Sequence, residues 1–250
     1  MFLHYIWIDF KNELNRNPII PPGFLSKIEN CRKINSGMDV KIWNGYDCRQ
    51  LLVENFPEYL NTYDSLPKPI MKCDMIRFFI LYKYGGFYMD MDRTCLKPLR
   101  DLLSNDPDVI LGAFRYLFFN FYNNDFLYSK PGSDFMRQCM QNIKLSHAPT
   151  NSLQVLLTAG PLFLVKQKLK YRGPDNIKVL YNQVNGCDIC KCNRDLSKSN
   201  SFPDYSTTSW TDSLDSIFIW IYCNFYLIIF ILIIVYLIRK LYFIRKISSI

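Results

Sequence analysis

Hydrophobic and polar positions follow two alternating periods along this chain, and the alternation predicts an α/β fold. Short apolar runs typical of strands precede longer runs in which apolar residues recur every three or four positions, as they do along a helix. Strands are expected at 2–8, 38–43, 87–90, 109–114, 120–129 and 177–182, and helices at 22–34, 46–56, 68–84, 133–144 and, as two pieces, across 152–170. This order favours a Rossmann-like, mostly parallel sheet with flanking helices and ligands at the carboxyl ends of the strands.

The strongest local pattern is the helix expected at 68–84. Asp74 and Arg77 lie three positions apart on it, on one turn, between large apolar residues that must be largely buried. Burying an ion pair costs more free energy through desolvation than the pairing gives back, unless another group also interacts with the pair. The pair is therefore a candidate for ligand binding, with a surface ion pair as the alternative. Gly85 and Gly86 then end the helix, because glycine adopts the left-handed conformation of a helix end cheaply.

Asp90 and Asp92 follow at the end of the next expected strand. On an extended segment, residues two apart point to the same side, so both carboxylates face one way while Met89 and Met91 face apolar packing. Two hard oxygen ligands can hold Mg²⁺ or Mn²⁺, whose remaining positions substrate phosphates commonly fill. Asp-x-Asp alone also occurs on solvated strand ends. Its place directly after a buried helix and a Gly-Gly turn favours a metal and phosphate site.

The segment from Lys72 to Asp92 resembles the sugar-binding DXD segment of glycosyltransferase family 32. It reads Lys-Cys-Asp-Met-Ile-Arg-Phe-Phe-Ile-Leu-Tyr-Lys-Tyr-Gly-Gly-Phe-Tyr-Met-Asp-Met-Asp. Three further segments are similar to that family in the same order: 3–8 with its Trp7, the Gly-Pro segment 158–164, and Ser209-Trp210. The stretch Asn123-Asn124-Asp125, with Lys130-Pro131-Gly132 after it, resembles the branch of the family that modifies lipids. The resemblance covers residues 1–215.

This resemblance implies a GT-A type nucleotide-sugar fold and a role for each matching residue. Trp7 is expected to stack on the nucleotide base and Asp74 to contact the ribose or the sugar. Arg77 is expected to neutralise phosphate or to hold Asp90 in place. Asp92 is expected to bind the cation, Mn²⁺ or Mg²⁺, with Asp90 shared between cation and sugar. The assignment makes both aspartates metal-binding and catalytic.

The remaining site residues follow from the same resemblance. Tyr88 and Asn124 are expected in the nucleotide-sugar site, and Ser209 and Trp210 are expected to stabilise charge on the departing diphosphate. Asp125 is a candidate for catalysis and, like Asn124, for contact with the sugar or the acceptor. In many relatives the late motif continues Ser-Trp-His, whereas Thr211 follows Trp210 here. A histidine near the metal is therefore in doubt in this chain.

The function that the resemblance implies is a membrane-anchored, metal-dependent glycosyltransferase that moves a hexose with retention of configuration. Similarity to inositol-phosphoceramide mannosyltransferases favours GDP-mannose as donor and a lipid as acceptor. A glycoprotein acceptor stays open, as does a catalytically silent relative that serves as a membrane-bound binding partner. A metal-dependent nucleotide hydrolase is disfavoured, because no further Asp/Glu cluster accompanies Asp90 and Asp92 as a two-metal site requires.

Residues 217–238 are 22 consecutive residues without a formal charge, and as a helix they would span about 33 Å, enough to cross a bilayer. A single-pass membrane helix is therefore expected there, between a glycosyltransferase domain at 1–210 with its linker 211–216 and a basic tail at 239–250. The basic tail favours a cytoplasmic C-terminus and a domain on the other side, in the Golgi or another endomembrane. No signal segment opens the chain, so translocation directed by this helix, a tail-anchored cytosolic domain and an upstream anchor all stay open.

Charge and cysteine content bound the other possibilities. Half of the net charge of +8 comes from four basic residues after 238, which leaves no concentrated basic stripe, so nucleic-acid binding is not expected. Among nine cysteines, Cys187, Cys190 and Cys192 form a cluster that favours local disulfides, with unpaired thiols as the next alternative and a zinc site less favoured. His4 is expected as a core residue. Five cysteines outside the cluster are expected as small core residues: Cys31, Cys48, Cys73, Cys95 and Cys139.

Overall fold

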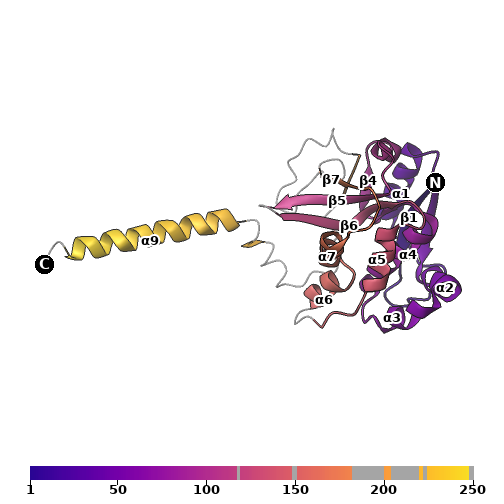
Figure 1. Ribbon diagram of the computed structural model, residues 1–250, viewed down its shortest axis with the longest axis horizontal. Coiled ribbons are helices and arrows are strands. Elements are labelled where there is room, and N and C mark those ends of the chain that lie inside the picture. Colours follow the sequence, from indigo (N-terminus) through magenta and orange to yellow (C-terminus); the bar gives the residue numbers. More distant parts are fainter. Residues whose placement is uncertain (117–118, 148–150, 182–199, 204–219, 222–223, 248–250) are drawn as a thin grey trace. The chain divides into compact units, whose positions relative to one another are not determined.

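The structure is a computed structural model that describes residues 1–116, 119–147, 151–181, 200–203, 220–221 and 224–247. The chain divides into two compact units, Met1–Thr208 and Ser209–Ile250. Strands and helices alternate through the first unit in the predicted order, and each predicted element there begins and ends within two residues of its expected bounds (Figure 1). The α/β class predicted from the periodicity is confirmed.

The central sheet of the first unit has six strands in the order β2-β1-β3-β6-β5-β7. These are β1 (Phe2–Trp7), β2 (Asp39–Asn44), β3 (Gly86–Met89), β5 (Val109–Tyr116), β6 (Phe119–Ser129) and β7 (Ile177–Leu180). Strand β1 pairs in parallel with β2 and β3, but β6 runs antiparallel to β3 and to β5. The predicted mostly parallel sheet is thus corrected to a mixed sheet. The connection between β5 and β6 is too short for a crossover, so these strands can pair only as an antiparallel hairpin.

Seven α-helices and two short 3₁₀ turns are described in the first unit. The helices are α1 (Pro22–Ile34), α2 (Gly45–Asn55), α3 (Leu60–Ser65), α4 (Pro69–Tyr84), α5 (Asp134–Asn142), α6 (Asn151–Thr158) and α7 (Pro161–Lys170), and the turns are η1 (Pro57–Tyr59) and η2 (Leu99–Leu103). A small second sheet pairs β4 (Arg93–Cys95) with β8 (Ser201–Pro203). Three-residue strands carry too little periodicity to be recognised in a sequence.

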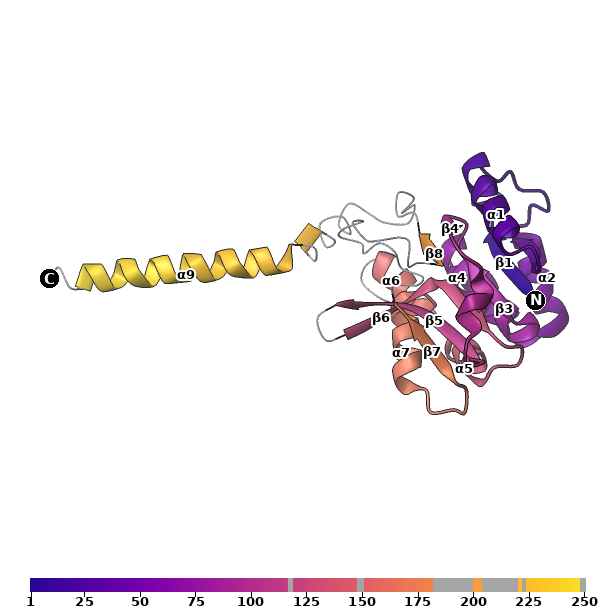
Figure 2. The ribbon, with the colours of Figure 1, turned by 90° about the horizontal axis from the view of Figure 1, so that it is seen from above.

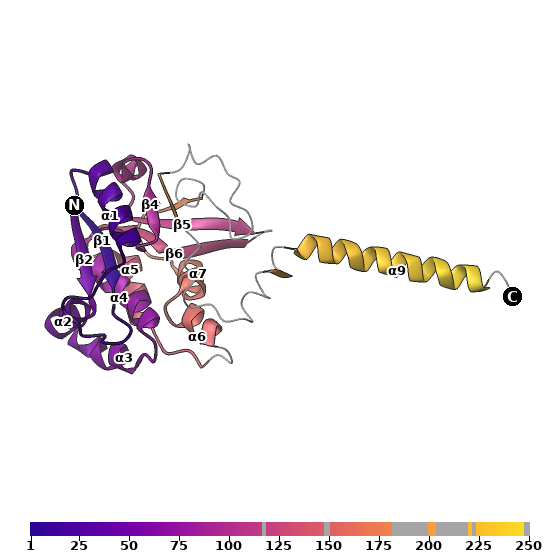
Figure 3. The same ribbon diagram turned by 180° about the vertical axis from the view of Figure 1, so that it is seen from behind.

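Two apolar clusters sandwich the central sheet, because side chains alternate between its faces. Along β1, Leu3 and Tyr5 pack on the side of α1, whereas Ile6 packs with α2 and α4 on the other side. Figure 2 shows α1 and α5 on opposite sides of the strands, and Figure 3 shows β1 beside β2 from behind. The result is a three-layer arrangement in which α4 is the most enclosed helix, since every residue from Met71 to Leu81 is buried.

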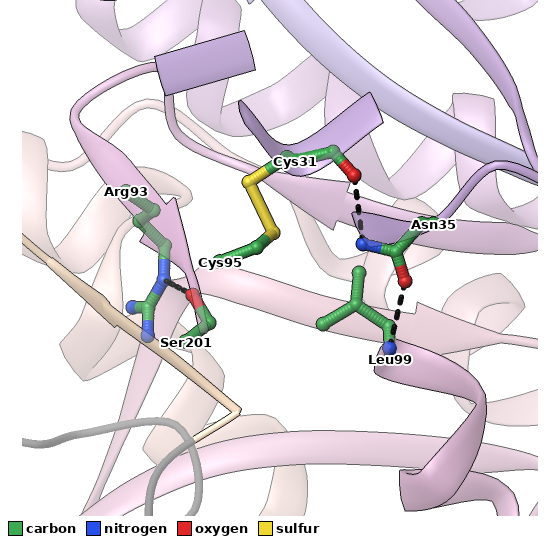
Figure 4. The surroundings of a disulfide bond; sticks show 6 residues. All are labelled: Cys31, Asn35, Arg93, Cys95, Leu99 and Ser201. Atoms are coloured by element: carbon green, nitrogen blue, oxygen red, sulfur yellow. Dashed lines mark hydrogen bonds between the residues drawn. A yellow bond between two sulfur atoms is a disulfide. The ribbon is translucent and has the colours of Figure 1, made fainter. Parts of the chain in front are cut away.

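A disulfide bond joins Cys31 of α1 to Cys95 of β4 (Figure 4). The Asn35 side chain lies beside it, donating to the carbonyl of Cys31 over 2.9 Å and accepting from the amide of Leu99 over 2.7 Å. Both cysteines are core residues, as predicted, but their disulfide was not predicted, because β4, which the sequence pattern did not reveal, brings Cys95 against α1. Cys48, Cys73 and Cys139 are free and buried, as predicted. The cluster Cys187, Cys190 and Cys192 lies outside the described residues.

The second unit contains helix α9 (Phe225–Ile247). No helix in the described part of the chain is long and apolar enough to cross a membrane. The structure therefore does not support the membrane-spanning helix predicted at 217–238. The described helix begins eight residues later than predicted and continues into the four basic residues Arg239, Lys240, Arg245 and Lys246.

The turn that ends α4 depends on Gly86. Its φ of 96° is left-handed, and a Cβ there would lie 2.4 Å from the carbonyl oxygen of Phe2. Gly132 has a similar φ of 74° but nothing within 4 Å of an added Cβ.

We expect Gly132→Ala to lower the free energy of unfolding by about 1 kcal/mol through backbone strain alone. Gly86→Ala should cost at least roughly 2 kcal/mol more, because β1 must move. Urea unfolding of both variants measures the difference between their free energies of unfolding. An equal loss of stability in the two variants would contradict the close approach of Gly86 to the carbonyl oxygen of Phe2.

Candidate active site

Trp7 and Asp90 lie at the same edge of the central sheet. Trp7 is the last residue of β1 and Asp90 directly follows β3, which runs parallel to β1 with His4 opposite Tyr88. Both residues therefore stand at carboxyl ends of neighbouring parallel strands, where α/β proteins place their ligands. The Trp7 ring is half-buried and packs at a tilt on Phe24 of α1, with ring centroids 5.4 Å apart. This placement of Trp7 and Asp90 was predicted and is confirmed.

A buried network of charged and amide groups lies under that edge. Arg77 Nη2 donates to Asp74 Oδ1 over 2.6 Å, and Asn124 Nδ2 donates to the same oxygen over 2.9 Å. Arg77 also donates through Nη1 to the carbonyl of Asn124 and through Nε to the carbonyl of Cys73. Asp74, Arg77 and Asn124 are all buried. The predicted buried pair is confirmed, and its partner is Asn124 of β6, whose carbonyl accepts from Arg77 and whose side-chain amide donates to Asp74.

Asp90 is held on three sides by groups of this network and its neighbours. Tyr88 donates its hydroxyl to Asp90 Oδ1 over 2.5 Å, and Arg77 Nη1 lies 3.6 Å from the same oxygen. The amide of Asp90 donates to the carbonyl of Asp125 over 2.9 Å. The Asp90 side chain nevertheless keeps 36% of its surface exposed, so it remains open to a ligand. Arg77 was expected either to neutralise phosphate or to hold Asp90 in place. Because Arg77 is buried, its position suits the second role.

The argument from alternating side chains assumed that Asp92 continues the strand. In the structure it does not. Strand β3 ends at Met89, and Met91 and Asp92 form a turn that the amide of Arg93 closes by donating to the carbonyl of Asp90 over 3.1 Å. The chain has to turn here because β4 leads away to pair with β8. Lys27 of α1 donates to the carbonyl of Asp92 over 3.1 Å. Met89 and Met91 are buried, as expected.

Arg93 is a residue that the sequence analysis missed. Its fully buried guanidinium donates to Asp125 Oδ2 over 2.6 Å and, through Nε, to Ser201 Oγ over 3.2 Å (Figure 4). It thereby joins the turn after Asp90 to β6 and to β8. A cation directly after Asp-x-Asp was a visible signal, but its partners lie 32 and 108 residues away, beyond the reach of local patterns.

Burial shifts the pKa values of three groups around the site. It raises the pKa of Asp74 to about 6, an effect that Arg77 partly opposes. It also raises the pKa of Asp125, again against a neighbouring arginine, Arg93. Asp125 Oδ1 is a buried oxygen without a hydrogen-bond partner in the described part of the chain, a costly arrangement for a carboxylate. His4 is fully buried, as predicted, and burial lowers its pKa to about 4.

The carboxylates suit a hard divalent cation. The described residues contain no group of three or more His, Cys, Asp or Glu side chains that could hold a metal ion, so a closed protein cage is not available in that part of the chain. Mg²⁺ usually needs only one or two carboxylates and fills its remaining positions with water and substrate phosphates. Asp90 and Asp92 can supply that set. Ser209 and Trp210 lie outside the described residues.

A hollow of about 710 Å³ lies elsewhere, between α1 and the edge strand β2. It is lined by residues of both elements, among them Leu25, Ile28 and Ile42, and by Met38 just before β2. None of the predicted site residues lines it. The carboxylates of the candidate site therefore stand at a different place on the first unit.

Residues 21–109 match the family model described as the glycosyltransferase sugar-binding region containing the DXD motif. The matched segment runs from just before α1 to the first residue of β5. It includes Asp74, Arg77, Asp90 and Asp92, but not Trp7, Asn124 or Asp125. The sequence match thus covers the part of the site that α4 and the turn after β3 contribute.

Several curated proteins are similar to this chain. Inositol phosphoceramide mannosyltransferase 1 of Schizosaccharomyces pombe is 31% identical over 227 residues, which cover 88% of this chain and 64% of that protein. Mannosyl phosphorylinositol ceramide synthase SUR1 of Saccharomyces cerevisiae is 28% identical over 63% of this chain and 41% of its own length. Uncharacterized glycosyltransferase L373 of Acanthamoeba polyphaga mimivirus is 33% identical over 57% of this chain and 55% of its own length. The chain therefore spans less than two thirds of each of these relatives.

Among solved structures, the PaToxG glycosyltransferase aligns with 66% of this chain and 67% of its own, at 16% identity and a TM-score of 0.45. This similarity is too low to establish a shared fold. The relation to glycosyltransferases is therefore carried by the sequence matches.

The raised pKa of Asp74 predicts a pH dependence of stability. Because the folded-state pKa of about 6 exceeds the unfolded value of about 3.9, this carboxyl stabilises the fold below pH 4. The contribution is lost as the pH rises through 6. Relative to Asp74→Asn, the wild type should lose roughly 3 kcal/mol of unfolding free energy between about pH 4 and pH 7. Urea unfolding across this range measures it, with Asp101→Asn, at an exposed carboxylate, as control. If the unfolding free energy of the wild type and of Asp74→Asn changed with pH in parallel, the raised pKa of Asp74 would be contradicted.

Proposed function

This chain carries the glycosyltransferase sugar-binding region that contains the DXD motif, and on that premise we propose that it is a metal-dependent glycosyltransferase. It moves a hexose, with mannose favoured, from a nucleotide-sugar donor, with retention of configuration. The observation that supports this most directly is the position of Asp90. Its carboxylate is held by Tyr88 and Arg77 at the carboxyl edge of parallel strands and yet stays open to a ligand.

Each residue of the site has a place in this proposal. Trp7 would stack on the base from its rim position at the end of β1. Asp74 would offer its second oxygen to the ribose or the sugar, since Oδ1 already accepts from Arg77 and Asn124. Arg77 would fix Asp90 through the 3.6 Å contact. Preorganised charges of this kind lower the barrier because they need no reorganisation during the reaction.

The cation of the proposal is Mn²⁺ or Mg²⁺, held by Asp90 and Asp92. When bound, it supplies positive charge against the departing diphosphate. The chain itself fixes the backbone that carries the two carboxylates: the amide of Asp90 donates to the carbonyl of Asp125, and the carbonyl of Asp92 accepts from Lys27. Ser209 and Trp210 are proposed to close on the same diphosphate.

For the acceptor, we propose a membrane lipid of the inositol phosphoceramide type, with GDP-mannose as donor. The support is the names of two relatives, an inositol phosphoceramide mannosyltransferase and a mannosyl phosphorylinositol ceramide synthase. A glycoprotein glycan is the alternative acceptor. A silent relative that only binds a partner is a second alternative, motivated by Thr211 where many relatives have histidine.

The proposed location is the Golgi or another endomembrane, with the first unit on the lumenal side. A disulfide between Cys31 and Cys95 favours this side, because such bonds form and persist in oxidising compartments. Attachment to the membrane is proposed for the second unit. Its helix α9 exposes large apolar side chains from Phe225 to Leu237, which a lipid surface would cover.

Donor binding tests the site before any acceptor is known. With Mn²⁺ present, GDP-mannose at about 100 times its Kd should raise Tm by roughly 5 °C. UDP-glucose and UDP-galactose are the competing donors. Asp92→Asn should keep the fold but lose the shift, whereas Asp101→Asn, at an exposed carboxylate outside the site, should keep it. Thermal unfolding of the full chain in detergent, with and without Mn²⁺, gives the measurement.

Protection of Asp92→Asn equal to that of the wild type would contradict the role of this carboxylate. No shift with any donor at saturation would contradict donor binding altogether. That second result would favour the silent relative and direct the search to binding partners.

Transfer of labelled mannose separates the two acceptor classes. Incubation with GDP-mannose, Mn²⁺ and either inositol phosphoceramide or a mannosylated glycoprotein should place the label in the lipid extract only. Because α- and β-linked products are distinguishable by linkage-specific mannosidases, the same product tests retention. Label in the glycoprotein alone would contradict the lipid acceptor while leaving the donor site intact.

A further inference from the structure

Exposed apolar side chains gather in one short stretch of the first unit. Nine large hydrophobic residues are exposed among its described residues, and four of them fall between positions 10 and 25. These are Phe10, Leu14, Ile19 and Leu25, and Ile19 keeps 90% of its surface exposed. We call residues 9–21, between β1 and α1, the rim loop. Scattered exposed hydrophobics are normal on a protein surface, but a gathering of this kind marks an interaction surface.

The rim loop is fixed from inside by polar contacts. Asp9 accepts from the amide of Lys11 over 2.9 Å and from the side chain of Asn15 over 3.2 Å. Glu13 pairs with Lys72 of α4 at 2.5 Å. The backbone of Glu13 also lies so close to Gly45 that a Cβ there would come within 1.8 Å of its carbonyl oxygen.

The second half of the loop is held by α2. Asn44, the N-cap residue of α2, donates to the carbonyl of Arg16 over 2.9 Å. The Arg16 guanidinium lies 3.8 Å from the centre of the Tyr46 ring. Contacts from Glu13 and from the backbone of Arg16 therefore hold the loop against the protein, while Phe10, Leu14 and Ile19 stay exposed. A loop held in this way presents Phe10, Leu14 and Ile19 at no further ordering cost.

The loop also borders the candidate active site. It leaves β1 two residues after Trp7 and leads into α1, whose Phe24 packs on the Trp7 ring. Lys27 on the next turn of α1 donates to the carbonyl of Asp92. A surface that binds the rim loop would therefore lie beside the edge of the sheet where the donor is proposed to bind.

The charges of the loop favour an anionic surface. The charge of Glu13 is offset by Lys72, so the two basic residues of the loop exceed its remaining acid, Asp9, by one positive charge. Its two basic residues, Lys11 and Arg16, are exposed. Apolar side chains next to basic ones are the composition with which proteins lie on membranes, because the former enter the headgroup region and the latter attract anionic lipids.

We propose that the rim loop docks on an anionic membrane surface, with Phe10, Leu14 and Ile19 in the headgroup region. The active site then faces the bilayer, and a lipid acceptor reaches it without leaving the membrane. Docking itself is independent of the proposed chemistry, and only its use for a lipid acceptor rests on the proposed function. It also differs from attachment through α9, because it fixes which face of the first unit meets the lipid.

Depth-dependent quenching of a new tryptophan tests the docking. The full chain, reconstituted in phosphatidylcholine vesicles with or without phosphatidylserine, carries Ile19→Trp or, as matched control, Leu169→Trp on α7, which is 67% exposed. After subtraction of the wild-type signal, Trp emission at position 19 should shift to the blue and be quenched by brominated lipid. Phosphatidylserine should strengthen both effects, and position 169 should show neither. Equal behaviour at the two positions would overturn the proposal, since attachment through α9 alone affects both alike.

A second comparison links docking to transfer. The triple variant Phe10→Ser, Leu14→Ser, Ile19→Ser should lose roughly tenfold or more of its transfer to an acceptor lipid in vesicles. The matched triple Val53→Ser, Leu157→Ser, Leu169→Ser, at exposed positions elsewhere, should not. Both should keep the Mn²⁺-dependent protection by donor. Unchanged vesicle transfer in the loop variant would overturn the docking role. Missing donor protection in the wild type would instead refute the proposed function and leave the quenching result to decide on docking.

Discussion

The buried Arg77 guanidinium is the group on which the site depends. A cation taken out of water costs several kcal/mol unless it is fully paired, and here it is met by Asp74, by the carbonyls of Cys73 and Asn124, and at 3.6 Å by Asp90. These partners come from α4, from β6 and from the end of β3. Helix α4 and two strands therefore cannot move apart without leaving a buried charge unpaired. That requirement adds to the contacts of Asp90 with Tyr88 and Asp125 in fixing its position.

The parts of the site that lie within one local segment could be read from the sequence. The helical spacing of residues 68–84 located α4, and the three-residue separation of Asp74 and Arg77 put both on one turn. Gly85 and Gly86 marked the end of the helix, since both adopt a positive φ. The parallel pairing of β1 and β3 followed from alternating strands and helices, and it placed Trp7 and Asp90 at one edge. Short-range geometry decides all of these features.

Features that join distant segments escaped the sequence, because nothing local encodes them. Arg93 meets Asp125 only because β6 returns antiparallel beside β3, and Cys31 meets Cys95 only because β4 leaves the central sheet. The extended geometry assumed for Asp92 failed for the same reason, since the departure of β4 requires a turn. The pattern of apolar runs also cannot tell parallel from antiparallel pairing, so the mixed sheet was missed.

The arginine contacts have a consequence for where the chain can be cut. A fragment limited to residues 21–109, the segment that carries the family match, would keep Arg77 but discard the Asn124 carbonyl that accepts from it. It would also leave Arg93 without its hydrogen-bond partners Asp125 and Ser201 and β4 without its paired strand β8. The sugar-binding region defined by sequence similarity is therefore not a folding unit. The smallest fragment expected to fold must begin with β1 and extend through β8, although more than a hundred residues separate β8 from the DXD motif in the sequence.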